Sequence, residues 1–69
     1  MLQSRPITEN GQMLGVARTV DRGWIFIATD PRLEDLHGMR FPSWSEAERV
    51  ALLVLDRDRA VPVYLNQAN

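Results

Sequence analysis

A short acidic segment with a single histidine comes closest to a catalytic or metal-binding pattern. His37 follows Glu34 and Asp35, and the spacing Glu-x-x-His places Glu34 and His37 on one face of a helix. A structural zinc site needs about four ligands, and the chain contains no other histidine and no cysteine. We therefore expect Asp30, Glu34 and Asp35 to lie in a solvated loop, with His37 as a solvated or capping residue.

Ser43 is better explained as a helix cap than as a nucleophile. No G-x-S-x-G frame surrounds it, and Ser43 and Glu46 have the spacing of a capping box. The four glycines form no phosphate-binding pattern. The chain has no lysine, which excludes a Schiff base, and no cysteine, which excludes disulfides and thiolate zinc sites. We expect no catalytic residue, no metal and no cofactor, and a protein that is not an enzyme.

The length and the net charge of the chain limit the remaining classes of function. Residues 1–69 are predicted to form one small domain, whose stability is marginal unless association buries further apolar surface. A net charge of −1 gives no general attraction to nucleic acid or to anionic membranes. Residues 1–8 do not resemble a signal peptide, and the longest apolar run, residues 50–55, is far shorter than the ~20 residues of a membrane span. The chain is expected to be soluble and cytoplasmic.

Two turn signals predict an antiparallel meander of three strands. Asn10-Gly11 accepts positive φ at both central positions of a tight hairpin turn, which joins a strand near residues 2–9 to one near residues 12–20. A three-residue loop, residues 21–23, then places its glycine in the left-handed region and leads into residues 24–29. The last of these segments is aromatic and β-branched, as strands prefer.

Asp30 and Pro31 predict a short helical turn after the meander, since they fit the N-cap and the first helical position. This turn is expected to end near Leu36 and to be closed by Gly38.

The main helix is predicted over residues 44–58, followed by a short C-terminal edge strand over residues 60–65. Pro62 lacks an amide hydrogen and so belongs on a sheet edge, as does Pro6 in the first strand. The order β-β-β-α-β predicts a two-layer α+β fold, with a three-stranded antiparallel meander and one main helix packed on one sheet face.

Both faces of the predicted sheet are apolar. The two turns pair Glu9 with Gln12 and Val20 with Trp24, and these pairs set the register. One face then carries Ile7, Leu14, Val16, Val20, Trp24, Phe26 and Ala28, with Arg5 and Arg18 among them. The other carries Met13, Gly15, Ala17, Ile25 and Ile27. We expect the helix on the second face, where small residues permit a close approach, although the pattern leaves the opposite docking open.

A second apolar face, together with Leu52 and Leu53 outside the main helical stripe, favours association. The leading hypothesis is a small non-catalytic interaction domain that forms a homodimer through an exposed sheet face or helix side. Its expected interface residues are Trp24, Phe26, Val16, Leu52 and Leu53.

Two alternatives remain. A nucleic-acid-binding module would use Arg5, Arg18, Trp24 and Phe26 on one face, where aromatic rings stack on bases, although the net charge opposes phosphate contacts. A small regulatory or inhibitor protein would dock a different protein through the same apolar surface.

Residues 12–55 resemble small modules in which a three-stranded sheet precedes a helix that opens with Ser/Thr-x-x-Glu-Ala. The resemblance rests on Gly38, Phe41, Ser43, Glu46 and Ala47. Such modules include the DNA-binding arm domains of tyrosine integrases and the antitoxins with a partial ribonuclease-H fold. The first group implies DNA binding, but this chain lacks the surplus of basic residues that those arms carry.

Overall fold

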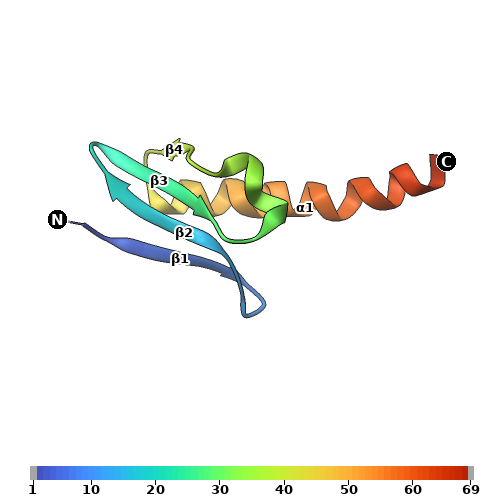
Figure 1. Ribbon diagram of the computed structural model, residues 1–69, viewed down its shortest axis with the longest axis horizontal. Helices are drawn as coiled ribbons and strands as arrows, with labels where there is room; N and C mark the ends of the chain where they lie inside the picture. Colours follow the sequence, from blue (N-terminus) through green and yellow to red (C-terminus); the bar gives the residue numbers. More distant parts are fainter. Residues whose placement is uncertain (1, 69) are drawn as a thin grey trace.

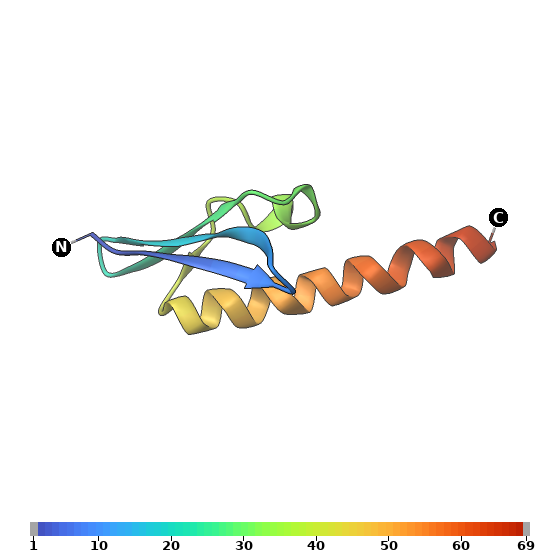
Figure 2. The same ribbon diagram turned by 90° about the horizontal axis from the view of Figure 1, so that it is seen from below.

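The computed structural model describes the backbone of residues 2–68 and the side chains of residues 2–59. Its elements follow in the order β1 (Ser4–Glu9), β2 (Gln12–Val20), β3 (Gly23–Ala28), the 3₁₀-helix η1 (Pro31–Leu36), β4 (Arg40–Phe41) and α1 (Trp44–Ala68). The strands form one antiparallel sheet in the order β1-β2-β3-β4, and α1 lies across one of its faces (Figures 1 and 2). The predicted α+β fold, its three-stranded meander and its single covering helix are confirmed.

The first hairpin forms as the sequence predicts. Asn10 and Gly11 adopt φ angles of 52° and 81°, both in the left-handed region that a tight hairpin turn demands. Glu9 pairs with Gln12. Strand β1 is an edge strand, which agrees with the presence of Pro6.

The second turn is shorter than predicted. Arg22, not Gly23, takes the left-handed conformation, with φ of 61°, and Val20 pairs with Gly23 instead of Trp24. Gly23 belongs to β3, where a Cβ atom would lie 3.0 Å from the carbonyl oxygen of Phe41. The glycine is therefore needed for the close approach of β4. Since one residue of slip exchanges the two faces of a strand, the predicted faces of β3 are wrong.

A bulge in β2 changes the register of the first hairpin as well. Thr8 pairs with Met13 but Ile7 pairs with Gly15, so Leu14 has no partner in β1. The Leu14 carbonyl instead accepts hydrogen bonds from the amides of Thr29 and Asp30, at 3.1 and 3.2 Å. The bulge allows Leu14 to be buried without moving Ala17 off the helix-covered face.

The predicted final strand over residues 60–65 is wrong, because α1 continues to Ala68. Beyond the sheet the helix extends alone, so this segment has no strand edge beside it (Figure 1). The open edge of β3 is taken by β4, which precedes the helix. No glycine follows Gly38, so the sequence carries no αL stop signal near residue 58.

One side of the sheet, η1 and α1 enclose the core. Ala47, Ala51 and Leu55 recur every four residues on α1 and are fully buried. They meet Ile7, Leu14, Ala17, Phe26, Leu33, Leu36 and Phe41. The helix thus lies on the side of Gly15 and Ala17, as expected. The rest of that face differs from the prediction, because Ile7, Leu14 and Phe26 lie under the helix whereas Ile25 and Ile27 lie on the opposite side. Among the described residues, no helix is both long and apolar enough to cross a membrane.

Ser43 caps α1, as the capping pattern predicts. Its Oγ accepts a hydrogen bond from the amide of Glu46 at 3.1 Å. The Glu46 carboxylate is hydrogen-bonded to Arg49, so half of the capping box is present.

Replacing Ser43 with alanine is expected to lower the free energy of unfolding by about 1 kcal/mol, because the Glu46 amide loses its acceptor. Urea denaturation followed by circular dichroism measures this loss. Ser45→Ala is the matched control, since Ser45 is exposed in the first turn of α1. Equal stability of the two variants would contradict the capping role.

Gly15→Ala is expected to destabilise the fold by about 1–3 kcal/mol through overpacking. The added Cβ would lie 2.4 Å from Cζ of the buried Phe26 ring and 2.6 Å from the Ile27 carbonyl oxygen. The same urea titration tests it. Adding Phe26→Leu to Gly15→Ala should cost less than the sum of the two single changes, and strict additivity would show that the ring is not the obstacle.

Candidate interaction surface

Two residues of the predicted interface belong to the core instead. Phe26 is fully buried beneath α1, and Trp24, on the same face, is partly buried and packed against the core. The cause is the register, because Phe26 pairs with Ala17 and not with Arg18. A side chain without exposed surface, such as that of Phe26, offers nothing to a partner, so this part of the predicted interface is corrected.

The residues of the predicted nucleic-acid surface are not brought together. Arg5 pairs with Ala17 on the helix-covered face, and its guanidinium carbon lies 5.1 Å from the ring centre of Trp44, in a cation–π contact. Arg18 pairs with Ile25 and therefore lies on the opposite face. With Phe26 buried between them, these side chains present no common aromatic and cationic surface.

The sheet face turned away from α1 is apolar and uncovered. Val16, Val20, Ile25 and Ile27 share this face, because Val16 pairs with Ile27 and the others alternate with the core residues along β2 and β3. All four are partly buried, yet none is among the residues packed against the core. Among the described residues no further layer lies over this side of the sheet (Figure 2). We call these four residues, with Pro6 opposite Val16, the open sheet face.

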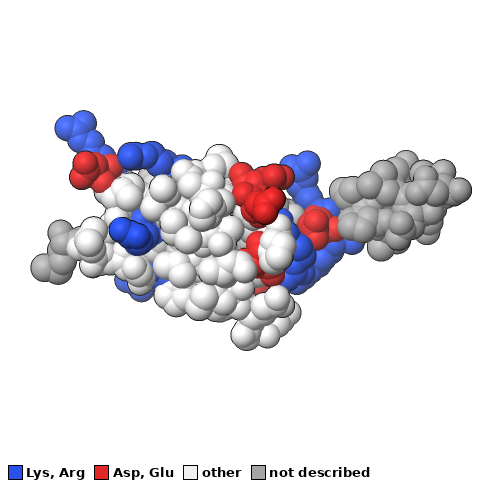
Figure 3. Space-filling view, viewed as in Figure 1, with Lys and Arg blue, Asp and Glu red and all other residues white. Residues whose placement is uncertain are grey.

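Arginines flank the open sheet face at one end. Arg18 of β2 and Arg40 of β4 lie on either side of Ile25 in the ladder, and both are exposed. Figure 3 looks onto this face and shows a broad uncharged centre, with mostly basic groups near the β2–β3 turn, and acidic groups near η1 that have basic groups beside them toward α1. The surface therefore combines an aliphatic centre with charges at its ends.

The helix side of the predicted interface is only partly available. Leu53 is 51% exposed, whereas Leu52 is partly buried and packs against the core. A single exposed leucine is common on soluble proteins. The helix side thus offers one exposed leucine, whereas the open sheet face groups four aliphatic residues.

The candidate chemical residues have structural partners. His37 accepts a hydrogen bond from the amide of Ala28 at Nδ1, at 3.1 Å, and Ser43 is the helix cap described above. An open pocket of about 440 Å³ lies beside His37, lined by Ala28, Thr29, Asp30, Pro31 and Glu34. Within the described residues, no three acidic or histidine side chains are grouped so that they could hold a metal ion.

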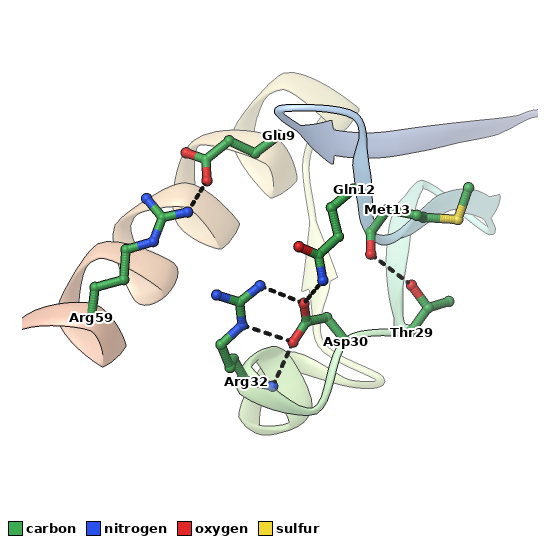
Figure 4. Close-up of polar contacts among 7 residues, drawn as sticks. All are labelled: Glu9, Gln12, Met13, Thr29, Asp30, Arg32 and Arg59. Atoms are coloured by element: carbon green, nitrogen blue, oxygen red, sulfur yellow. Dashed lines mark hydrogen bonds and ion pairs between the residues drawn. The ribbon is translucent and has the colours of Figure 1, made fainter. Parts of the chain in front are cut away.

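Asp30 is a buried charge whose hydrogen bonds are complete. Its Oδ1 accepts from the amide of Arg32 at 2.9 Å and from Nε at 3.0 Å; Oδ2 accepts from Nη2 at 2.7 Å and from Nε2 of Gln12 at 3.2 Å (Figure 4). These bonds from Arg32 lower the pKa of the Asp30 carboxyl from 3.8 to about 2. The Asp30 carboxylate is therefore ionised and links η1 to the first hairpin through hydrogen bonds. It is not suited to proton transfer.

The same hairpin is linked to α1 and to the end of β3. Glu9 forms an ion pair with Arg59 of the helix, and the Thr29 hydroxyl donates to the Met13 carbonyl at 3.4 Å (Figure 4). These contacts tie the β1–β2 hairpin to α1 and to the segment that follows β3.

Sequence reasoning missed Val20, Ile25, Ile27 and Arg40 as members of one surface. The sequence does contain a signal for this arrangement, because side chains that face each other on neighbouring strands must match in size. A ring as large as that of Phe26 requires small residues opposite, and Gly15 and Ala17 provide them. This match places Phe26 with the small residues and turns Ile25 and Ile27 to the other side.

Comparisons of the chain with protein-family models, curated proteins and solved structures find no significant match.

Acid should weaken the wild-type fold partly through Asp30. A pKa lowered on folding stabilises the folded state above pH 4, and that contribution is lost as the pH falls toward 2. Asp30→Asn should be less stable at pH 7 and should lose less stability on acidification than the wild type. Urea titrations at pH 7, 4 and 2.5 measure both quantities. Parallel losses in the two proteins would exclude this role, because Glu46, whose pKa is also lowered, titrates in both.

Proposed function

We propose that this protein is a small non-catalytic interaction domain that pairs with a second copy of itself through the open sheet face. The observation that carries the proposal is the group of Val16, Val20, Ile25 and Ile27 on a sheet face that no described element covers. An antiparallel sheet with one face in water normally alternates apolar and polar residues. Here that face is aliphatic at its centre, which favours a covered state.

Energetics support association through this face. Full burial of a Val or Ile side chain contributes about 1.5–3 kcal/mol. The four aliphatic residues lie in three successive rows of the β2–β3 ladder on this face: Val16 with Ile27, Arg18 with Ile25, and Val20 with Gly23. Two sheets that pack face to face lie about 10 Å apart with interdigitated aliphatic side chains. Branched aliphatic residues suit this packing, whereas the aromatic rings that would stack on bases are on the helix side. The composition of the face therefore favours a second sheet over nucleic acid.

A second copy is the occupant that the chemistry favours. The face presents aliphatic residues at its centre and opposite charges at its two ends, so it is complementary to itself. Self-complementary surfaces form closed two-fold dimers, the commonest arrangement of soluble oligomers. A domain of 69 residues also gains stability from the added burial.

Ile27→Glu is expected to weaken self-association at least tenfold, because a charge would be buried at the centre of the contact. Sedimentation equilibrium from micromolar to millimolar concentration measures the dimer dissociation constant. Leu53→Glu is the matched control on the helix side, with a more exposed leucine, and should leave association unchanged.

Two results would overturn this proposal. The first is a monodisperse monomer of 7.9 kDa at all concentrations, which would leave the face for a different protein. The second is a dimer weakened by Leu53→Glu and not by Ile27→Glu, which would move the contact to the helix. Circular dichroism of both variants confirms that each is folded.

A further inference from the structure

The charges around the open sheet face are separated along the strands. Arg18, Arg22 and Arg40 lie at the end where β2 turns into β3, against a single acidic residue, Asp21. All three arginines are exposed. Arg40 donates to the carbonyl oxygen of Asp21 at 3.3 Å, a contact with the backbone that leaves its charge unbalanced.

The opposite end is acidic. Strand β3 leads at its carboxyl end into η1, which carries the exposed residues Glu34 and Asp35. The other two charges of this segment cancel, because Asp30 and Arg32 pair with each other. Figure 3 shows the resulting acidic group near η1. Arg57 and Asp58 of α1 line the same hollow as Asp35, and their charges cancel. The two ends of the face thus carry opposite net charge.

These charges do not neutralise each other within one molecule. Ile25, level with Arg18 and Arg40, is three residues from the end of β3, or about 10 Å, and η1 lies beyond it. That distance is about one Debye length at physiological salt. Among the residues whose side chains the structure describes, the ion pairs involve neither these two arginines nor Glu34 or Asp35.

Symmetry allows two simple face-to-face dimers. A two-fold axis parallel to the strands would place each end over its own counterpart, so the arginines of the two copies would face one another. An axis across the strands would place the arginine end of each copy over the η1 end of the other. The first arrangement brings like charges together, and the second brings opposite charges together twice.

We infer that the open sheet face pairs with a second copy about an axis across the strands, with Arg18 and Arg40 of each copy facing Glu34 and Asp35 of the other. This inference rests on the proposed function and adds the orientation of the partner. The aliphatic centre supplies the affinity, and the charges at the ends select this orientation.

Two complementary charge reversals test the orientation. Arg18→Glu with Arg40→Glu places acidic groups at both ends of the face, and Glu34→Arg with Asp35→Arg places basic groups at both ends. Each variant alone is expected to dimerise at least about tenfold more weakly than the wild type, because like charges then meet twice. An equimolar mixture should recover association, since each copy then meets opposite charges at both ends.

Sedimentation equilibrium measures the single variants, and native mass spectrometry identifies the mixed dimer. Arg49→Glu is the control, because it reverses an exposed charge on α1 whose partner is Glu46 of the same helix. The wild-type dimer should also weaken as salt rises, a readout that needs no variant. The neutral pairs Arg18→Gln with Arg40→Gln, and Glu34→Gln with Asp35→Gln, replace any reversal that fails to fold.

The outcomes separate the two proposals. The orientation is overturned, with the open sheet face kept as the contact, if both reversal variants dimerise as tightly as the wild type. It is also overturned if the equimolar mixture does not recover association. Reversal homodimers as tight as the wild type, together with a mixed dimer tighter than the wild type, also overturn it, because that pattern requires like charges to face each other in the wild type. A wild type that stays monomeric overturns both proposals.

Discussion

The packing of the Phe26 ring against Gly15 determines which face of the sheet is inside. The ring occupies the space that a side chain at position 15 would fill, since a Cβ there would lie 2.4 Å away. Ala17 beside it, with Ala47 and Ala51 across the interface, lets the helix come close enough to seal the ring completely. The opposite face is defined by the same contact, because strand residues alternate. Burying Phe26 turns Ile25 and Ile27 outward.

Local signals in the sequence were sufficient for the parts of the fold that local chemistry decides. The hairpin at Asn10-Gly11, the cap at Asp30 and the cap at Ser43 each depend on residues within one turn of each other, and all three form as predicted. Register depends on more distant contacts. Local spacing marks Gly23 as the turn glycine, whereas its packing against the Phe41 carbonyl makes it a strand residue. The short strand β4 joins the sheet in place of the strand predicted over residues 60–65. Periodicity cannot reveal it, because it has only two residues.

The candidate interface also has one property that the local sequence predicts and one that depends on the register of the strands. That both sheet faces are apolar could be predicted, because this conclusion does not change when the register slips by one residue. The identity of the outer residues could not, because it changes completely with that slip. Trp24 and Phe26 were expected outside and lie on the core side, while Ile25 and Ile27 take their place. Only Val16 and Leu53 of the expected interface lie on surfaces that a partner could reach without disturbing the core.

This exchange of residues alters the chemistry that the outer surface can perform. A face of Trp24, Phe26 and Arg18 would offer flat rings beside guanidinium groups, a combination suited to unstacked bases. The observed face instead offers branched aliphatic side chains around Ile25, with Arg18 and Arg40 on either side. Such side chains gain most from interdigitating with others of their kind. In the proposed dimer, the arginines at one end of this face meet the acidic residues of η1 of the other copy. A one-residue difference in a turn thus removes the aromatic and cationic surface that the nucleic-acid alternative required, and leaves an aliphatic surface in its place.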